Sequence, residues 1–309
     1  MDIDKKIDAA INICNGGRDR KVKFNRIYPF TTENISGYID LFDLKDKSLF
    51  TVGSSGDQVF NASLVGCKDI TLFDICPFTE EYFYLKLASI MLMTREELLD
   101  FFCYKNYPKR YFHNRKAFLE SNFYSLLNYL ENIKPEVVYF WTELLKRFKG
   151  RQIRDNLFIG DEDSVKILKR VNRYLESDEA YNLLRKRLSD TNITFKHGNI
   201  FKLEDDTKYD NVFLSNIATY CKLDDVLYMF YKMYDRLNDN GEMLVSYLYD
   251  TTKDSEYLPG EDEIYDLRRV FNTFPKELEL YSFIGNTGYA FNTPRMKDSV
   301  LTYKKVKKI

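Results

Sequence analysis

Two short apolar runs enclose a glycine-containing turn and a segment of helical length near the start of the chain. Ser48 to Val52 reads SLFTV, GSSGD follows it, apolar residues recur at helical spacing from Gln58 to Val65, and Asp69 to Ile75 reads DITLFDI. Short apolar runs bounded by turn residues predict strands, and the spacing between them predicts a helix. We therefore expect a β-α-β unit with parallel strands and a right-handed crossover.

A long series of helical patterns separates this unit from a second β-rich region. Pro77 ends the second strand, the helix-length run EEYFYLKLASIMLM follows, and Arg95 to Asp190 holds amphipathic segments without a convincing strand. Strands and helices alternate again in ITFKHGNI, YDNVFLSNI, DDVLYMFYKMYDRL, the turn NDNG and EMLVSYLY, and then in a helix around 264–271 and the strands LELYSFIG and SVLTYKK. This order favours an α/β fold, a doubly wound and mostly parallel sheet with a helical insertion and a C-terminal antiparallel strand.

The same pattern predicts three parts of the chain. We expect an N-terminal helical arm or lid over 1–47, a cofactor-binding domain made of 48–94 and 191–309, and a helical insertion over 95–190.

Composition and charge indicate which binding partners and which cellular compartment to expect. The 309 residues are 44% hydrophobic and carry a net charge of -1, so no overall basic field would attract nucleic acid. The five cysteines are scattered without a C-x-x-C pair, which predicts buried free thiols and no structural zinc site. The charged N-terminus and the lack of a run of about 20 apolar residues predict no signal peptide, no membrane span and a cytoplasmic location.

The turn after the first strand is the strongest candidate for a ligand site. Gly53 and Gly56 would allow the backbone to approach a ligand closely, and Ser54, Ser55 and Asp57 add polar partners. The turn has neither the lysine of a P-loop nor the G-x-G-x-x-G spacing, which disfavours phosphate or pyrophosphate. A plain strand-to-helix turn is the structural alternative.

Polar residues also follow the next strands. Asp74, followed by Ile75, ends the second strand, where a carboxylate can accept hydrogen bonds from both ribose hydroxyls of a nucleoside. Asn199 with Ile200 and Ser215 with Asn216 follow the third and fourth strands. Because ligands bind beyond the carboxyl ends of parallel strands, these residues predict a nucleoside ligand without phosphate, and S-adenosylmethionine is the commonest such cofactor.

A family resemblance supports this prediction. The order of LFTVGSSGDQVFNA, ITLFDICP, YFYLKLAS, HGNIF and VFLSNI resembles the S-adenosylmethionine-dependent transferases that include the diacylglycerol 3-amino-3-carboxypropyltransferase of betaine-lipid synthesis, a group similar in fold to class I methyltransferases. The resemblance covers roughly 48–88 and 193–220. It implies a Rossmann-like methyltransferase sheet with Asp74 at the ribose, Asn199 and Ile200 on the adenine side, Ser215 and Asn216 near the sulfonium, and the turn residues at the methionine moiety: Gly53, Ser54, Ser55, Gly56 and Asp57.

The acceptor and the transferred group stay open at this stage. We expect methyl or 3-amino-3-carboxypropyl transfer to a small-molecule acceptor, with Tyr28 and Tyr220 as candidate catalytic residues on the acceptor side. The carboxylates of 161–163 form a charge run, and no set of residues predicts a metal site.

Two other classes of function remain as alternatives. One is a regulatory protein that binds the cofactor without transferring a group. The other is an RNA-modifying methyltransferase whose phosphate contacts would come from basic residues of the insertion: Lys105, Lys109, Arg110, Arg115 and Lys116. The sequence does not fix an oligomeric state.

Overall fold

The computed structural model describes residues 2–16, 27–31, 33–103, 115–158, 165–204, 206–217, 223–246, 281–289 and 297–305. They divide into two compact units. Unit 1 comprises Met1–Thr31, Gly53–Asp57 and Asp74–Lys169, and unit 2 comprises Thr32–Val52, Gln58–Phe73 and Arg170–Ile309. The domain boundaries expected after residues 47, 94 and 190 follow the sequence pattern and stay a prediction.

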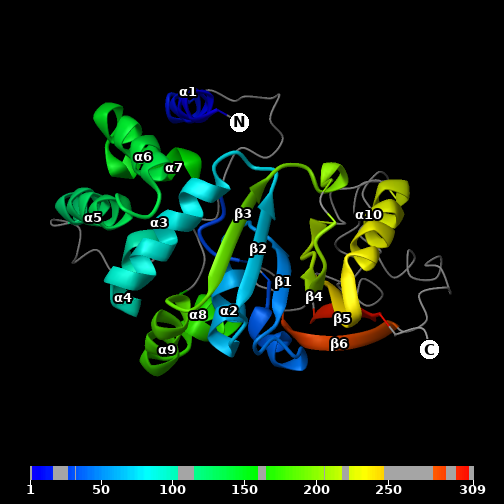
Figure 1. Ribbon diagram of the computed structural model, residues 1–309. Helices are drawn as coiled ribbons and strands as arrows, with labels where there is room; N and C mark the ends of the chain where they lie inside the picture. Colours follow the sequence, from blue (N-terminus) through cyan, green and yellow to red (C-terminus); the bar gives the residue numbers. More distant parts are fainter. Residues whose placement is uncertain are drawn as a thin grey trace. The chain divides into compact units, whose positions relative to one another are not determined.

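A seven-stranded sheet forms the centre of unit 2 (Figure 1). Its strand order is β3-β2-β1-β4-β5-β7-β6. Strand β1 pairs in parallel with β2 and β4, β4 pairs in parallel with β5, and β7 runs antiparallel to both β5 and β6. The strands are β1 (Ser48–Val52), β2 (Asp69–Asp74), β3 (Asn192–His197), β4 (Tyr209–Phe213), β5 (Leu237–Val245), β6 (Tyr281–Tyr289) and β7 (Lys297–Lys304).

This topology confirms the predicted fold class. The sheet is doubly wound and mostly parallel, and its antiparallel strand lies near the C-terminal end of the chain. The strand order reverses between β1 and β4, and such a reversal is where open α/β sheets bind ligands.

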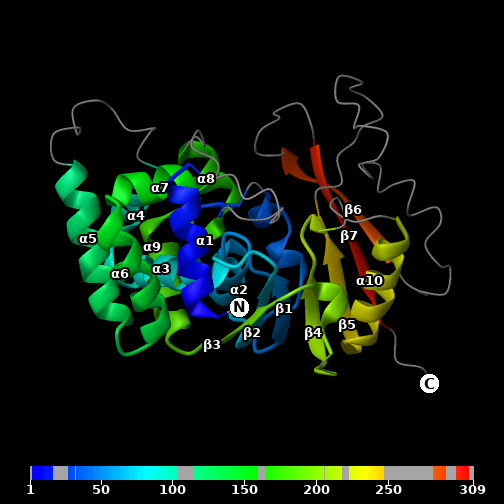
Figure 2. The same ribbon diagram turned by 90° about the horizontal axis from the view of Figure 1, so that it is seen from above.

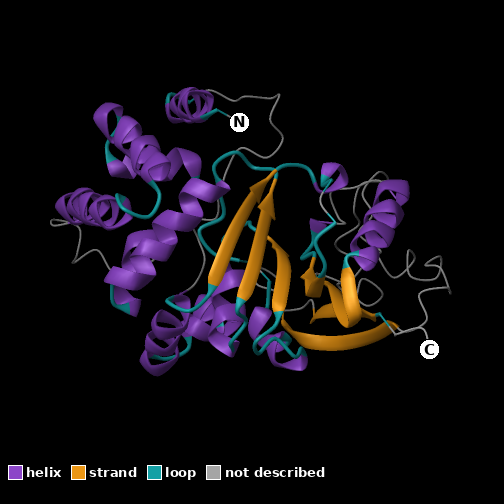
Figure 3. Ribbon diagram, viewed as in Figure 1, coloured by secondary structure: helices purple, strands orange, loops and turns teal. Residues whose placement is uncertain are grey.

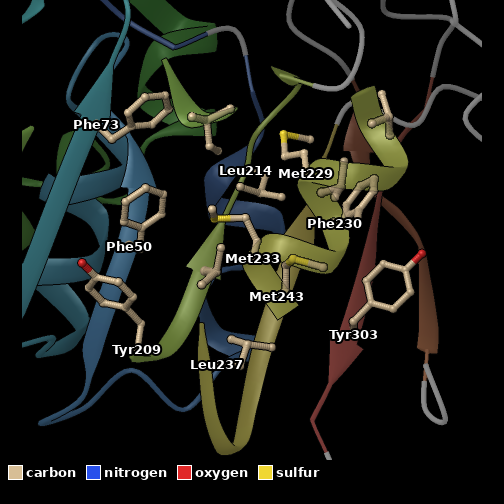
Figure 4. Close-up of a cluster of buried hydrophobic side chains, with 14 residues drawn as sticks. Phe50, Phe73, Tyr209, Leu214, Met229, Phe230, Met233, Leu237, Met243 and Tyr303 are labelled. Atoms are coloured by element: carbon tan, nitrogen blue, oxygen red, sulfur yellow. The ribbon is translucent and has the colours of Figure 1, made fainter. Parts of the chain in front are cut away.

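Apolar packing between α10 (Leu223–Asp235) and the sheet holds unit 2 together (Figure 4). Met229, Phe230 and Met233 of α10 lie in one buried cluster with side chains of β1, β4, β5 and β7. Phe50 of β1 stacks on Phe73 of β2 with 5.7 Å between the ring centroids. Helix α9 (Asp178–Leu188) lies in unit 2, whereas α2 (Asp57–Val65) and α8 (Val165–Val171) begin in unit 1 and end in unit 2.

Unit 1 is a helical assembly (Figures 2 and 3). Helix α1 packs on α6 and α7, and α3 packs on α5 and α6. The buried Lys6 of α1 donates to Glu81 of α3 at 2.6 Å, and Trp141 Nε1 of α6 donates to the Glu81 carbonyl. The helices are α1 (Ile3–Cys14), α3 (Thr79–Leu92), α4 (Arg95–Phe102), α5 (Arg115–Leu130), α6 (Pro135–Arg147) and α7 (Gly150–Leu157).

The NDNG residues, predicted as a turn, lie within the bounds of β5, and Asn240 there has a positive φ of 63°. The β4–β5 register jumps from Tyr209 opposite Leu237 to Asn211 opposite Glu242, so the extra residues form an irregularity within the strand. A Cβ atom at Gly241 would lie 2.9 Å from the carbonyl oxygens of Asn238 and Asp210, which explains the glycine. Helix α7 lies within the range 95–190 predicted to be helical, and the helix expected around 264–271 lies outside the described residues.

The Phe50 packing gives a stability prediction. Phe50→Ala should lower the free energy of unfolding by about 3 to 5 kcal/mol, because the fully buried ring leaves a cavity beside Phe73. Chemical denaturation monitored by circular dichroism measures the change. Leu41→Ala, at an exposed position of the same unit, is the control and should change it little. Equal effects of the two substitutions would contradict the packing described here.

Candidate functional site

The turn between β1 and α2 is closed by its own backbone. The Gly56 N–H donates to the Gly53 carbonyl at 2.7 Å, and Ser54 and Gly56 have positive φ angles of 37° and 77°. Glycine takes such angles at little cost, whereas at Ser54 the conformation is strained. Ser54, the strained residue, is also the one whose N–H donates to Asp74 at the end of β2.

Asp74 lies directly against this turn, in unit 1. Its Oδ2 accepts a hydrogen bond from the Ser54 N–H at 2.6 Å, and its Oδ1 accepts one from the Cys76 N–H at 2.8 Å. A Cβ atom at Gly53 would lie 3.2 Å from the Asp74 Cβ and 3.0 Å from Cγ2 of Thr79. The absence of a side chain at Gly53 therefore lets the turn approach the carboxylate.

Burial raises the pKa of Asp74, while hydrogen bonds from Cys76, Ser54 and Thr79 act in the opposite direction. The residue is 8% exposed, and the next residue, Ile75, is a large apolar residue that is 43% exposed. A carboxylate beside an open apolar side chain suits a ligand that carries both hydroxyl groups and an apolar ring.

A buried ion pair holds the other end of the turn. Lys86 of α3 and Asp57 are both fully buried, and Nζ lies 2.6 Å from Oδ1. Lys86 also donates to the Pro29 carbonyl at 2.7 Å and to the Ser55 carbonyl at 3.0 Å. The second oxygen of Asp57 accepts from the Thr31 N–H at 2.5 Å and from the Ser55 hydroxyl at 2.9 Å. These contacts join three separate segments of unit 1.

Lys86 also lies over the Phe30 ring, 4.2 Å from its centroid. Burial lowers the pKa of Lys86, and the neighbouring Asp57 acts to raise it. Lys86 was not among the predicted site residues, although it lies in the stretch YFYLKLAS that carries the family resemblance. A single lysine in the apolar run FYLKLASIML was the available signal.

The residues of the turn between β1 and α2 thus hydrogen-bond to other groups of the protein. The buried Ser55 hydroxyl donates to the buried Asp57 carboxylate, and the Ser54 N–H donates to Asp74. Direct contact of these residues with a cofactor stays a prediction.

A second polar group lies in unit 2. The Ser215 hydroxyl, after β4, donates to the buried carboxylate of Glu33 at 2.9 Å, and Ser215 has a positive φ of 49°. Glu33 was missed because nothing in the run TTENISGY distinguishes it from a surface acid.

The remaining predicted contacts of unit 2 have different surroundings. Asn199 caps a 3₁₀ turn by accepting from the Phe201 N–H, and Ile200 belongs to the buried apolar cluster under α10. Asn216 is half-buried. Their predicted roles at the adenine and at the sulfonium are untested by these contacts.

Of the two candidate catalytic tyrosines, only Tyr28 is described. It is 39% exposed and follows Ile27, whose N–H donates to the Leu157 carbonyl at 2.9 Å. Tyr220 lies outside the described residues, as do Lys105, Lys109, Arg110 and the charge run 161–163.

Within the described part of the chain, no three or more His, Cys, Asp or Glu side chains gather in a way that could hold a metal ion. Cys14, Cys67, Cys76 and Cys103 are buried free thiols, as predicted, and burial raises the pKa of Cys76 to about 12. None of the helices in the described ranges has the length and apolar composition that a bilayer crossing requires.

Comparison with known proteins gives structural similarities alone. No protein-family model and no curated protein matches the chain. Among solved structures, the glycopeptide N-methyltransferase MtfA is similar with a TM-score of 0.44 and 9% identity over 93% of this chain and 95% of its own. The N-methyltransferase NodS from Bradyrhizobium japonicum WM9, in complex with S-adenosyl-L-homocysteine, is similar with a TM-score of 0.41 and 8% identity over 98% and 99%. Similarities of this size do not identify a function, so the function has to be argued from the residues of this chain.

The Lys86–Asp57 pair gives a second stability prediction. Lys86→Met should lower the free energy of unfolding by about 3 to 5 kcal/mol, because it leaves a buried carboxylate without its partner. The double variant Asp57→Asn with Lys86→Met removes both charges and should recover part of this loss. Chemical denaturation measures both variants.

The matched control is Lys146→Met, which breaks an exposed ion pair with Glu143 in the same unit. Exposed pairs contribute little, so its stability should stay close to wild type. A Lys86→Met variant that unfolds at the same denaturant concentration as this control would show that the buried pair does not hold the turn.

Proposed function

We propose that the chain is an S-adenosylmethionine-dependent transferase that moves a methyl or 3-amino-3-carboxypropyl group to a small-molecule acceptor. The observation that carries the proposal is the Asp74 carboxylate, which the Ser54 N–H holds at 2.6 Å against a glycine turn at the end of a parallel strand. The doubly wound sheet supports the proposal, because such sheets bind nucleosides at these strand ends.

The turn and Asp74 fit a nucleoside without phosphate. The Ser54 and Cys76 N–H groups donate to separate oxygens of the Asp74 carboxylate, and Thr79 and Ile75 also hydrogen-bond to it. In the proposed complex the ribose hydroxyls would share this carboxylate, and the exposed side chain of Ile75 would contact the adenine ring. A Cβ atom at Gly53 would lie 3.0 Å from Cγ2 of Thr79, so the glycine allows the turn to pack closely against Asp74.

Catalysis would depend mainly on binding and orientation. S-adenosylmethionine supplies a carbon that is already activated by a positively charged sulfur. The protein therefore has to align the acceptor with that carbon and hold it in the orientation that transfer requires. The proposed residues on the acceptor side are Tyr28 and Tyr220, and the other proposed cofactor contacts are Gly53, Ser54, Ser55, Gly56, Asp57, Asn199, Ile200, Ser215 and Asn216.

Binding of the cofactor's derivatives tests the proposal. Asp74→Ala should weaken the binding of S-adenosylmethionine, S-adenosylhomocysteine and methylthioadenosine by about 2 kcal/mol, or roughly 30-fold, because each loses charge-assisted hydrogen bonds to the ribose. Titration calorimetry measures the dissociation constants. Preference for methylthioadenosine would favour aminocarboxypropyl transfer, and preference for S-adenosylhomocysteine would favour methyl transfer.

Asp69→Ala is the control, because Asp69 is an exposed aspartate at the opposite end of the same strand. Its affinities should equal those of wild type. The proposal is overturned if wild type binds none of the three nucleosides, or if the Asp69 and Asp74 variants lose affinity equally.

A further inference from the structure

A short segment that precedes the first strand is fastened to the turn between β1 and α2. Residues 27–31, which we call the strap, belong with this turn to unit 1. At one end of the strap the Ile27 N–H donates to the Leu157 carbonyl at 2.9 Å. At the other end the Thr31 N–H donates to Oδ2 of Asp57 at 2.5 Å. The strap is therefore held at both ends, and at one of them by the carboxylate that closes the turn.

The middle of the strap is bound to α3. The Pro29 carbonyl accepts hydrogen bonds from the Tyr82 hydroxyl at 2.6 Å and from Lys86 Nζ at 2.7 Å. Phe30 is 1% exposed, meets the Phe102 ring edge-on with 6.1 Å between centroids, and lies with its ring centroid 4.2 Å from Lys86 Nζ. The position of the strap is thus fixed by polar and apolar contacts together.

Lys86 joins the strap to the turn. The same ammonium nitrogen that donates to the Pro29 carbonyl donates to the Ser55 carbonyl of the turn at 3.0 Å and lies 2.6 Å from Oδ1 of Asp57. The two carbonyl oxygens can therefore lie no further apart than these two hydrogen bonds allow. Because Lys86 is fully buried, its hydrogen bonds are shielded from water, where bonds to a charged donor are strong.

The strap carries the proposed acceptor-side residue next to its anchored carbonyl. Tyr28 is 39% exposed and directly precedes Pro29, whereas Ile27 and Phe30 are buried. At the other end of the turn, the Ser54 N–H donates to Asp74, the proposed ribose contact. The backbone that presents Tyr28 and the backbone that contacts Asp74 therefore depend on one buried lysine.

We propose that Lys86 is a positioning residue that sets the separation between the cofactor-binding turn and the strap that carries Tyr28. This inference rests on the proposed function, because the separation matters for transfer only when the turn binds the cofactor. Transfer needs the acceptor aligned with the activated carbon, and a misplacement of about 1 Å can cost roughly 100-fold in rate. A nucleoside that fixes the turn should also restrain the strap, because Lys86 links the two.

Hydrogen exchange measured by mass spectrometry tests this link in wild type. The amides of Tyr28, Phe30 and Thr31 are followed with and without saturating S-adenosylhomocysteine. We expect the nucleoside to slow their exchange by about 10-fold, because opening of the strap becomes linked to the occupied turn. A peptide from α5 of the same unit reports overall stabilisation, and equal slowing in α5 and the strap overturns the inference.

Lys86→Met removes the donor to both carbonyls. In this variant S-adenosylhomocysteine should slow exchange in the strap no more than in α5. A lysine that only stabilises the fold would leave the response of the strap to the nucleoside unchanged, and that result overturns the inference. Circular dichroism checks folding, and if Lys86→Met does not fold, Asp57→Asn with Lys86→Met carries the same test at saturating nucleoside.

Two controls separate the link from general loosening. Phe30→Ala removes the ring that packs beside Lys86 but leaves the hydrogen bonds of Lys86 in place. It should speed exchange in the strap without nucleoside and keep the slowing by S-adenosylhomocysteine. Lys146→Met, at an exposed ion pair of the same unit, should behave as wild type.

The calorimetry described for the proposed function separates the two possible failures. If S-adenosylhomocysteine binds wild type and its affinity depends on Asp74, but exchange in the strap does not respond, only the role of Lys86 fails. If no nucleoside binds wild type, the proposed function and the role of Lys86 both fail.

Discussion

The fully buried ion pair between Lys86 and Asp57 is the constraint on which the geometry of unit 1 depends. A lysine without solvent contact has to be paired and hydrogen-bonded, and here its three donors reach Asp57, Ser55 and Pro29. These contacts fix one end of the turn after β1. The other end then presents the Ser54 N–H to Asp74, so the placement of the candidate ribose carboxylate follows from a charge buried elsewhere.

Three buried carboxylates near strand ends serve different purposes. Asp57 has a lysine partner and acts as part of the scaffold. Asp74 accepts from backbone N–H groups and keeps a small exposed fraction. Glu33 accepts from neutral side chains beside an unsatisfied amide oxygen. A lysine partner compensates the charge of a buried acid, and hydrogen bonds from backbone and side-chain donors lower the cost of burying it.

The sequence predicted the elements better than the contacts. Strand β1 begins and ends where the apolar run SLFTV predicted, and the alternation of strands and helices was sufficient for the fold class. The strand expected at EMLVSYLY begins earlier than predicted, at Leu237, because β5 includes the NDNG residues at a register irregularity. Lys86 and Glu33 were missed for another reason: whether a charged residue is buried depends on distant segments, which local spacing does not encode.

The burial of Glu33 has a consequence for evolution in the laboratory. A carboxyl group whose pKa is higher in the folded than in the unfolded protein opposes folding once the pH rises above its ordinary value. The charged Glu33 side chain would therefore lower the thermal stability of the folded protein. A library of variants screened for heat resistance at neutral pH should accumulate uncharged residues at position 33, and the selected variants would reveal which side chains its buried surroundings tolerate.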